Sequence, residues 1–380
     1  MIPYGRQHIT QADIEAVVAT LQSDYLTQGP AIAEFENNFA QYIGCKYAVA
    51  VTNGTAALHL SAMALGVKAG SKVITTPITF AASANCIKYC GGDVDFVDID
   101  PDTLLLDIHK VKARLEAAPK GTYSGIVVVD FAGYAADIEA FRQLANEHNL
   151  WILEDACHAP GGYFIDSKGT KQMCGNGQYA DAAIFSFHPV KHIATGEGGM
   201  ITTNRRDIYE QLLLLRTHGI TKNPQLMGKN EGGWYHEMQI LGYNYRLPDI
   251  LATLGNSQLQ RANEGMQRRQ QIAQRYIAAF DGTNVQYTHT PPNVYHGYHL
   301  FVIQTDRRLE LYNHLHSQQI FVQVHYIPCH LHPYYRQLGW TDGDMPLAEQ
   351  YYSRAISLPM YPSLSNQQQD FVIEQVLSFF

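Results

Sequence analysis

Lys191 is the most reactive candidate in the sequence. It lies in SFHPVKHIATGEGG (186–199), between the apolar runs AAIFSF and GMITT. A lysine that is held against a core has a lowered pKa and can form Schiff bases with carbonyl compounds. A solvated lysine is the plainer alternative, and the apolar runs on both sides favour the buried one.

The carboxylate of Asp155 is a second candidate. The apolar run WILED (151–155) ends in Glu154 and Asp155, and His158 follows shortly after. A buried carboxylate is costly unless it meets a cation or hydrogen-bond donors. It could cap a helix, or it could hold a heteroaromatic nitrogen in its protonated form. At about 4 Å and an effective dielectric constant of about 20, such a pair is worth on the order of 4 kcal/mol, or roughly three pKa units.

Two further segments combine turn residues with polar side chains. In YAVAVTNGTAALHL (47–60), Gly54 and Thr55 stand where an expected strand meets an expected helix. The free N–H groups and the dipole of a helix start favour an anion such as phosphate. An ordinary turn with a threonine cap is the alternative. In GYNYRLPDI (242–250), Asn244 by itself indicates only a structured loop.

The elements that must position these side chains alternate between strands and helices. We expect strands at 47–51, 72–76, 93–99, 125–131, 151–155, 182–187 and 199–203, and helices at 55–65, 80–90 and 137–149. Several of these strands are apolar throughout, as strands buried on both faces are. The alternation predicts a doubly wound, mainly parallel sheet of the α/β class. Ligands of such sheets bind at the carboxyl ends of the strands, where the candidate residues lie.

The character of the sequence changes near residue 250. A long helical stretch (248–280) leads into a strand, a helix, a further strand and two terminal helices. We therefore expect a large domain over 1–250 and a small α+β domain over 251–380. An amphipathic helix that begins after Thr10 is free to pack on the small domain.

Composition excludes several classes of protein. The 380 residues carry 27 Lys and Arg against 35 Asp and Glu, a net charge of −8, which argues against a general nucleic-acid binder. Six scattered cysteines without a C-x-x-C pair indicate a reducing, cytoplasmic setting. Without a long apolar run or an apolar leader, we expect neither membrane spanning nor export.

Competing motifs fail on their context. GNGQYA (175–180) matches a dinucleotide fingerprint, but a strand and not a helix follows it. The 17 histidines include HYIPCHLHP (325–333), whose spacing does not suggest a defined metal geometry. We expect no metal site.

Taken in order, the motifs LTQGP, NGTAAL, TPITFAASAN, WILED, SFHPVK, GEGG and GYNYR resemble the DegT-type nucleotide-sugar aminotransferases. These enzymes use pyridoxal 5′-phosphate (PLP) in the aspartate-aminotransferase fold, PLP fold type I. The resemblance covers nearly the whole chain. One departure is Asn53, where many members have serine.

The resemblance implies a role for each candidate. Lys191 would hold PLP as a Schiff base and later move the proton, and Asp155 would pair with the pyridinium nitrogen. The other implied cofactor contacts are Phe80 stacked on the ring, His158 beside it, Gly54, Thr55 and Ser186 on the phosphate, and Asn244 on the phosphate of the neighbouring subunit. A homodimer would then be needed to complete each site.

The resemblance also implies a ping-pong reaction in which L-glutamate donates the amino group and a keto-sugar nucleotide accepts it. Three segments look most like the C4 transaminases of pseudaminic acid biosynthesis: SFHPVKHIATGEGG, TPITFAASANCIKY and VHYIPCHLHPYY. Their acceptor is a UDP-linked 4-keto-6-deoxy-N-acetyl hexose, and their product is UDP-4-amino-4,6-dideoxy-N-acetyl-β-L-altrosamine. Six residues match positions that line the sugar-nucleotide site, or else pack between the domains: Tyr4, Tyr25, Leu26, Thr27, His325 and Tyr326.

Other activities remain open at this point. The acceptor could be another nucleotide-linked 4-keto or 3-keto sugar. PLP-dependent dehydratases share the fold, but they replace the lysine by histidine, so Lys191 argues against them. A non-catalytic PLP-binding sensor would need the same cofactor residues without turnover.

Overall fold

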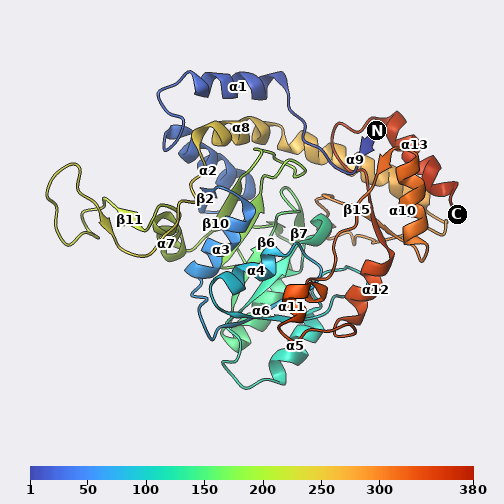
Figure 1. The fold of residues 1–380 in the computed structure, drawn as a ribbon, viewed down its shortest axis with the longest axis horizontal. Coiled ribbons are helices and arrows are strands. Elements are labelled where there is room, and N and C mark those ends of the chain that lie inside the picture. Colours follow the sequence, from blue (N-terminus) through green and yellow to red (C-terminus); the bar gives the residue numbers. More distant parts are fainter.

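The computed structural model describes residues 1–380 and is built around a seven-stranded sheet. The strand order is β2-β10-β9-β6-β5-β3-β4 (Figure 1). The strands are β2 (Tyr47–Val51), β3 (Lys72–Thr75), β4 (Asp93–Phe96), β5 (Gly125–Val129), β6 (Trp151–Asp155), β9 (Ala182–Ser186) and β10 (Gly199–Thr203). The strands β4, β3, β5, β6 and β9 pair in parallel. The predicted mainly parallel α/β sheet is confirmed.

Strand β10 is the exception, because it runs antiparallel to both β9 and β2. Parallel neighbours need a long crossover, whereas antiparallel neighbours can be joined by a loop. The loop 187–198 makes this connection directly, without a helix. Lys191 is therefore carried at the carboxyl end of β9, on the same edge of the sheet as the end of β6.

Helices flank the sheet and mostly follow the predicted pattern. They are α2 (Pro30–Ile43), α3 (Gly54–Ala64), α4 (Ala82–Tyr89), α5 (Ile108–Glu116), α6 (Ile138–His148) and α7 (Arg206–Arg216). The cap of α3 is Asn53, whose side chain accepts a hydrogen bond from the backbone N–H of Ala56 at 2.8 Å. The threonine cap considered as the alternative is therefore wrong, and Thr55 lies inside the first turn.

The C-terminal part forms a second layered unit. The predicted helical stretch 248–280 is two helices, α8 (Asp249–Gln260) and α9 (Ala262–Phe280), which meet at Arg261. Strands β13 (Gln286–Tyr287), β15 (Phe301–Gln304) and β17 (Ala355–Leu358) form an antiparallel sheet. Helices α10 (Arg308–Ser317) and α13 (Asn366–Leu377) lie beside it in Figure 1.

The remaining elements are short. They are β7 (Tyr163–Ile165), β8 (Lys171–Met173), β11 (Ile220–Thr221), β12 (Glu237–Met238), β14 (Val294–Tyr295), β16 (Ile320–Phe321), η1 (Phe131–Gly133), η2 (Cys329–Leu331), α11 (Pro333–Arg336) and α12 (Pro346–Arg354). The predicted strand at 320–326 is a strand over its first two residues only, and Gln323 adds an isolated bridge to Ser357. None of the helices combines the length and the hydropathy that crossing a membrane requires.

Buried apolar residues form two clusters. One surrounds the large sheet, and the other consists of Ile2 and residues between 272 and 376. Ile2 belongs to β1 (Ile2–Pro3), which pairs with β16. The next element, α1 (Gln11–Leu21), lies along α8 (Figure 1) and begins with the predicted cap at Thr10. The predicted division into domains 1–250 and 251–380 stays a prediction.

The apolar face predicted for α1 is not buried within the chain. Ile14, Val18 and Leu21 are each about half exposed, whereas Asp13 is buried. Asp13 accepts hydrogen bonds from Ser257 and other residues of α8 and its C-terminal end. In the single chain, α1 therefore docks through a polar contact and leaves its apolar face uncovered.

Candidate active site

The loop that carries Lys191 is closed by its own backbone. The N–H of Phe187 donates to the carbonyl of Gly198, and the N–H of Thr195 donates to the carbonyl of Phe187, both at 2.9 Å. The N–H of Lys191 donates to the carbonyl of His188 at 2.8 Å. Burial lowers the pKa of the Lys191 amine, against the opposing effect of nearby acidic groups. A neutral amine is a nucleophile and can accept a proton.

Asp155 ends β6 and is 6% exposed. Its Oδ2 accepts a hydrogen bond from the Ser83 hydroxyl at 2.6 Å, and its Oδ1 accepts one from the N–H of Cys157 at 3.2 Å. Ser83 is also within 2.7 Å of the Thr79 hydroxyl. Donors to both oxygens stabilise the ionised carboxylate, so Asp155 is suited to hold a cationic partner.

The start of α3 meets the end of β9 and offers an anion site. A Cβ added at Gly54 would lie 3.0 Å from Cβ of Ser186, so the glycine permits this close approach. The hydroxyl of Ser186 accepts from the N–H of His188 at 3.4 Å. Gly54, Thr55 and Ser186 are thus brought to one place, next to unpaired N–H groups at the helix start.

His158 is buried and neutral. Its Nδ1 accepts a hydrogen bond from the N–H of Ala132 at 3.2 Å, and its Nε2 lies 3.2 Å from the Tyr326 hydroxyl. Burial, with Lys191 adding to it, lowers the pKa of His158 well below its usual value. Because Nδ1 accepts, the single proton of the neutral ring is on Nε2, which donates to Tyr326.

Aromatic contacts extend the site from Tyr326. The ring of Phe80 is 61% exposed, with its centre 6.2 Å from that of Tyr326. The rings of Tyr4 and His325 lie 5.2 Å apart. Nδ1 of His325 lies 2.8 Å from the Ser357 hydroxyl, and burial lowers the pKa of His325 to about 3. An exposed aromatic ring at this edge of the sheet is suited to stacking on a flat ligand.

Four predicted residues lie apart from this group in the single chain. Tyr25, Leu26, Thr27 and Asn244 are exposed, and no hydrogen bond or aromatic contact joins them to the other candidates. The carbonyl of Leu26 accepts from the N–H of Asp249 at 3.0 Å, and Asn244 forms a backbone bridge with Thr217. Their predicted roles in the site would require a second subunit.

Several polar residues in or near the site received no role from the sequence. Ser83 is one, and its only signal was its place in the TPITFAASAN motif. Asp130 and Glu154 are others: they are buried together with Cys174, and their ligand-type atoms lie within 4.8 Å of one another. Two carboxylates this close in a buried site cannot both be ionised. Burial raises the pKa of Asp130 to about 7 and that of Glu154 well above its usual range.

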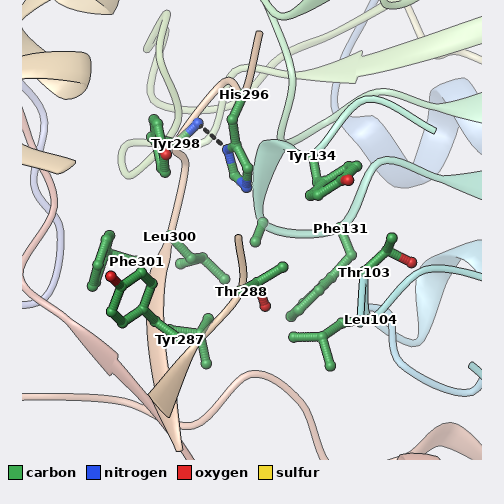
Figure 2. Close-up of a pocket in the computed structure, with 12 residues that line it drawn as sticks. Thr103, Leu104, Phe131, Tyr134, Tyr287, Thr288, His296, Tyr298, Leu300 and Phe301 are labelled. Carbon is green, nitrogen blue, oxygen red and sulfur yellow. Dashed lines mark hydrogen bonds between the residues drawn. The ribbon is translucent and has the colours of Figure 1, made fainter. Parts of the chain in front are cut away.

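A small cavity borders the site behind Phe131 (Figure 2). Its volume is about 20 Å³, which is room for a water molecule and not for a sugar nucleotide. Tyr134, His296, Tyr298 and Leu300 are among the residues that line it. The cavity therefore marks where the 296–302 segment crosses η1, and it is not a substrate pocket.

A lysine, a carboxylate with both oxygens satisfied and an anion-binding helix start meet at one edge of the sheet. The profile of the DegT/DnrJ/EryC1/StrS aminotransferase family matches residues 7–377. The chain belongs to this family. It is a sugar aminotransferase, and its cofactor is pyridoxal 5′-phosphate. The expected fold, enzyme class and cofactor are confirmed.

Relatives match this aminotransferase from end to end. The spore coat polysaccharide biosynthesis protein SpsC of Bacillus subtilis is 38% identical over 99% of this chain and 96% of its own. The UDP-4-amino-4,6-dideoxy-N-acetyl-beta-L-altrosamine transaminase of Campylobacter jejuni is 34% identical over 100% of this chain and 97% of its own.

Solved structures agree with this aminotransferase over the same length. Spr1654 of Streptococcus pneumoniae, in its PMP-form, has a TM-score of 0.90 at 29% identity and covers 99% of this chain and 98% of its own. Helicobacter pylori PseC, an aminotransferase involved in the biosynthesis of pseudoaminic acid, has a TM-score of 0.89 at 30% identity, with 100% and 99% covered.

Proposed function

We propose that this aminotransferase moves the amino group of L-glutamate to C4 of a UDP-linked 4-keto-6-deoxy-N-acetyl hexose. The product would be UDP-4-amino-4,6-dideoxy-N-acetyl-β-L-altrosamine, a precursor for pseudaminic acid. The observation that carries this substrate is the similarity, over the full chain, to the Campylobacter transaminase that bears this product's name. The similarity to PseC supports it.

The residues at the sheet edge fit the cofactor. Asp155, with donors on both oxygens, would pair with the ring nitrogen. Because Gly54 has no side chain, Ser186 can lie beside the start of α3, where a phosphate would bind. Phe80 would stack on the ring and Lys191 would bind the aldehyde carbon. When bound, PLP supplies an electron sink through which an amino group passes between two carbonyl carbons.

Lys191 is proposed to carry the proton. Its half-buried side chain comes from a loop that backbone hydrogen bonds close, and burial lowers the pKa of the amine, so Nζ is suited to take a proton from the α-carbon of the donor. His158 is hydrogen-bonded to Ala132 and Tyr326. As a neutral ring it would add no positive charge next to the cofactor ring, whose nitrogen already carries one. The half-reaction with the amino donor and the half-reaction with the keto-sugar acceptor then take place one after the other at the same site.

The acceptor is proposed to bind where Tyr4, His325 and Tyr326 lie together. Tyr25, Leu26 and Thr27 would join them, and Asn244 would reach the cofactor phosphate across a homodimer. Their exposure in the single chain supports a position at a subunit interface. A cytoplasmic location stays a prediction.

A direct assay tests this function. The purified protein is incubated with L-glutamate and a panel of UDP-, GDP- and dTDP-linked 4-keto sugars, and the products are identified by NMR. We expect stereospecific amination at C4 of the UDP-linked N-acetyl hexose, which gives the L-altro product. Preferred turnover of a GDP- or dTDP-linked sugar, or no amination of the UDP-linked N-acetyl hexose, would contradict the proposed substrate.

A second candidate is amination of another nucleotide-linked keto sugar. The observation that favours it is the higher identity to SpsC, which takes part in spore coat polysaccharide biosynthesis. The same panel tests this candidate, because preferred turnover of any acceptor other than the UDP-linked N-acetyl hexose would favour it.

A further inference from the structure

Three histidine rings form a column beside the catalytic lysine. The rings of His158 and His299 lie 4.3 Å apart at 39°, and those of His299 and His192 lie 5.9 Å apart. The three residues come from separate segments: the turn after β6, the strand entry before β15, and the lysine loop. Their contact places His192 and His299, two histidines that no sequence motif explained, beside the site.

The segment 296–300, which carries His299, is held tightly against the large domain. The N–H of Leu300 donates to the carbonyl of Ala132 at 3.1 Å. A Cβ added at Gly297 would lie 3.1 Å from both Cα of Ala159 and the carbonyl oxygen of His158. In Figure 2 this segment runs past Phe131 with His296, Tyr298 and Leu300 along it. Its backbone therefore has little freedom to move away from His158.

Helix α9 holds the same segment from the other side. Arg269 is 1% exposed and donates to the carbonyl oxygens of Tyr298 and Met360, both at 3.0 Å. No carboxylate pairs with this guanidinium. Gln270 Nε2 also donates to the carbonyl of His296 at 2.5 Å. The backbone that carries the His299 ring is thus held from one side by Ala132 and from the other by α9.

His299 itself gains nothing from hydrogen bonding. Neither of its ring nitrogens has a partner within the chain, and Nδ1 is buried. Whatever His299 contributes to the site within this chain, it therefore contributes through the packing of its ring and not through a hydrogen bond of its nitrogens. His192 differs, because its Nε2 donates to the carbonyl of Gly297 at 2.7 Å.

We propose that His299 is a positioning residue, whose ring excludes water from His158 and holds it in the orientation that donates to Tyr326. The proposal adds a residue to the site and rests on the proposed role of His158. With the His299 ring in place, His158 keeps Nδ1 on the Ala132 N–H and Nε2–H on the Tyr326 hydroxyl.

The surroundings of His158 make its charge state sensitive to this packing. The titratable groups that face His158 are Lys191, His192, His299, His325 and Tyr326. Asp155 lies three residues before it, at the end of β6. Burial is the first cause of its lowered pKa, and the positive charge of Lys191 adds to it. Removal of the ring of His299 would admit water and weaken the burial effect.

The test compares His299→Ala, His299→Gln and His299→Phe in the cofactor-loaded protein and in the cofactor-free protein. Ring nitrogens labelled with ¹⁵N report the tautomer and titration of His158, whose signal is assigned by its loss in His158→Gln. For the alanine and glutamine variants we expect the titration of His158 to move toward about 6.5, the value in water. The phenylalanine variant, which keeps a ring there, should leave it low.

The glutamate half-reaction, followed by the visible absorption of the cofactor, gives a second measurement. We expect its rate in His299→Ala and His299→Gln to fall further at pH 6 than at pH 8, with KM for glutamate little changed. If His299→Ala fails to fold, the glutamine variant decides. An unchanged His158 tautomer and titration in a folded alanine or glutamine variant would overturn the proposal.

This outcome is independent of the acceptor sugar, because the NMR measurement needs no substrate. His314→Ala on α10 is the control, since this residue lies outside the histidine column. Failure of the glutamate reaction in the unmodified protein would contradict the proposed donor and leave the His158 measurement valid.

Discussion

Ser83→Ala is expected to weaken the hold of the enzyme on its cofactor. The Ser83 hydroxyl donates to Oδ2 of Asp155 at 2.6 Å, and both residues are buried. A hydrogen bond to a charged group is worth about 1.5–3 kcal/mol. Part of this energy is also lost from the cofactor-free protein, where the hydrogen bond already exists. Since about 1.4 kcal/mol corresponds to a tenfold change in affinity, the Kd for pyridoxal phosphate should rise by up to about tenfold.

The alanine retains Cβ and removes only the donor, so packing changes little. Without this donor, Oδ2 of Asp155 loses its partner in a site that water barely reaches, and the ionised carboxylate becomes costlier. Thr79 lies one step further away, with its hydroxyl 2.7 Å from that of Ser83. Thr79→Ala should therefore weaken binding less than Ser83→Ala does.

The assay is equilibrium dialysis of the cofactor against each variant, with thermal unfolding measured in parallel. Ser61→Ala is the matched control, because Ser61 is a buried serine of α3 whose hydroxyl has no partner. Its loss should leave cofactor affinity unchanged. If Ser83→Ala binds the cofactor as tightly as the unmodified protein does, the assignment of Asp155 as a carboxylate supported by this donor is refuted.

Three further predictions concern other parts of the site. Lys191→Ala should abolish borohydride trapping of the cofactor on the protein, and peptide mapping that finds the trapped cofactor on another lysine would contradict the assignment. Asn244→Ala should weaken cofactor retention through the dimer partner; a stable monomer that binds the cofactor equally well would show that no cross-subunit contact exists. Burial raises the pKa of Asp130 to about 7, so the folded protein keeps a proton that the unfolded chain releases above about pH 4. Stability from this group is therefore present at low pH and lost as pH rises toward 7. In Asp130→Asn, the free energy of unfolding in urea should fall less between pH 5 and pH 8 than it does in the unmodified protein. An unchanged pH dependence would show that Asp130 ionises normally.

Much of the site could be predicted from local patterns. The apolar runs that end at Asp155 and Ser186 are strands in the structure, and the end of a parallel strand is where a ligand-binding side chain is expected. The close contact of Gly54 with Ser186 brings together two residues that the sequence placed at strand ends. These features follow from patterns of neighbouring residues, which determine strands, turns and helix starts.

Other features depend on pairs that are distant in the chain. The Ser83–Asp155 hydrogen bond joins residues 72 positions apart, and the Tyr326–His158 contact spans 168. No local pattern shows which serine will face which carboxylate, since this depends on how α4 lies across the sheet. The break between α8 and α9 likewise falls in a stretch whose periodicity reads as one helix.

The sequence by itself therefore determined the order of the elements and the mainly parallel sheet, and it predicted the lysine and the carboxylate of the site. Only the tertiary structure decided which side chains support them, that three histidine rings pack against one another beside the lysine, and that the apolar face of α1 stays uncovered in one chain. The physical reason is that strand and helix formation depend on neighbours in the chain. Burial, charge state and hydrogen-bond partners depend on which distant segments meet.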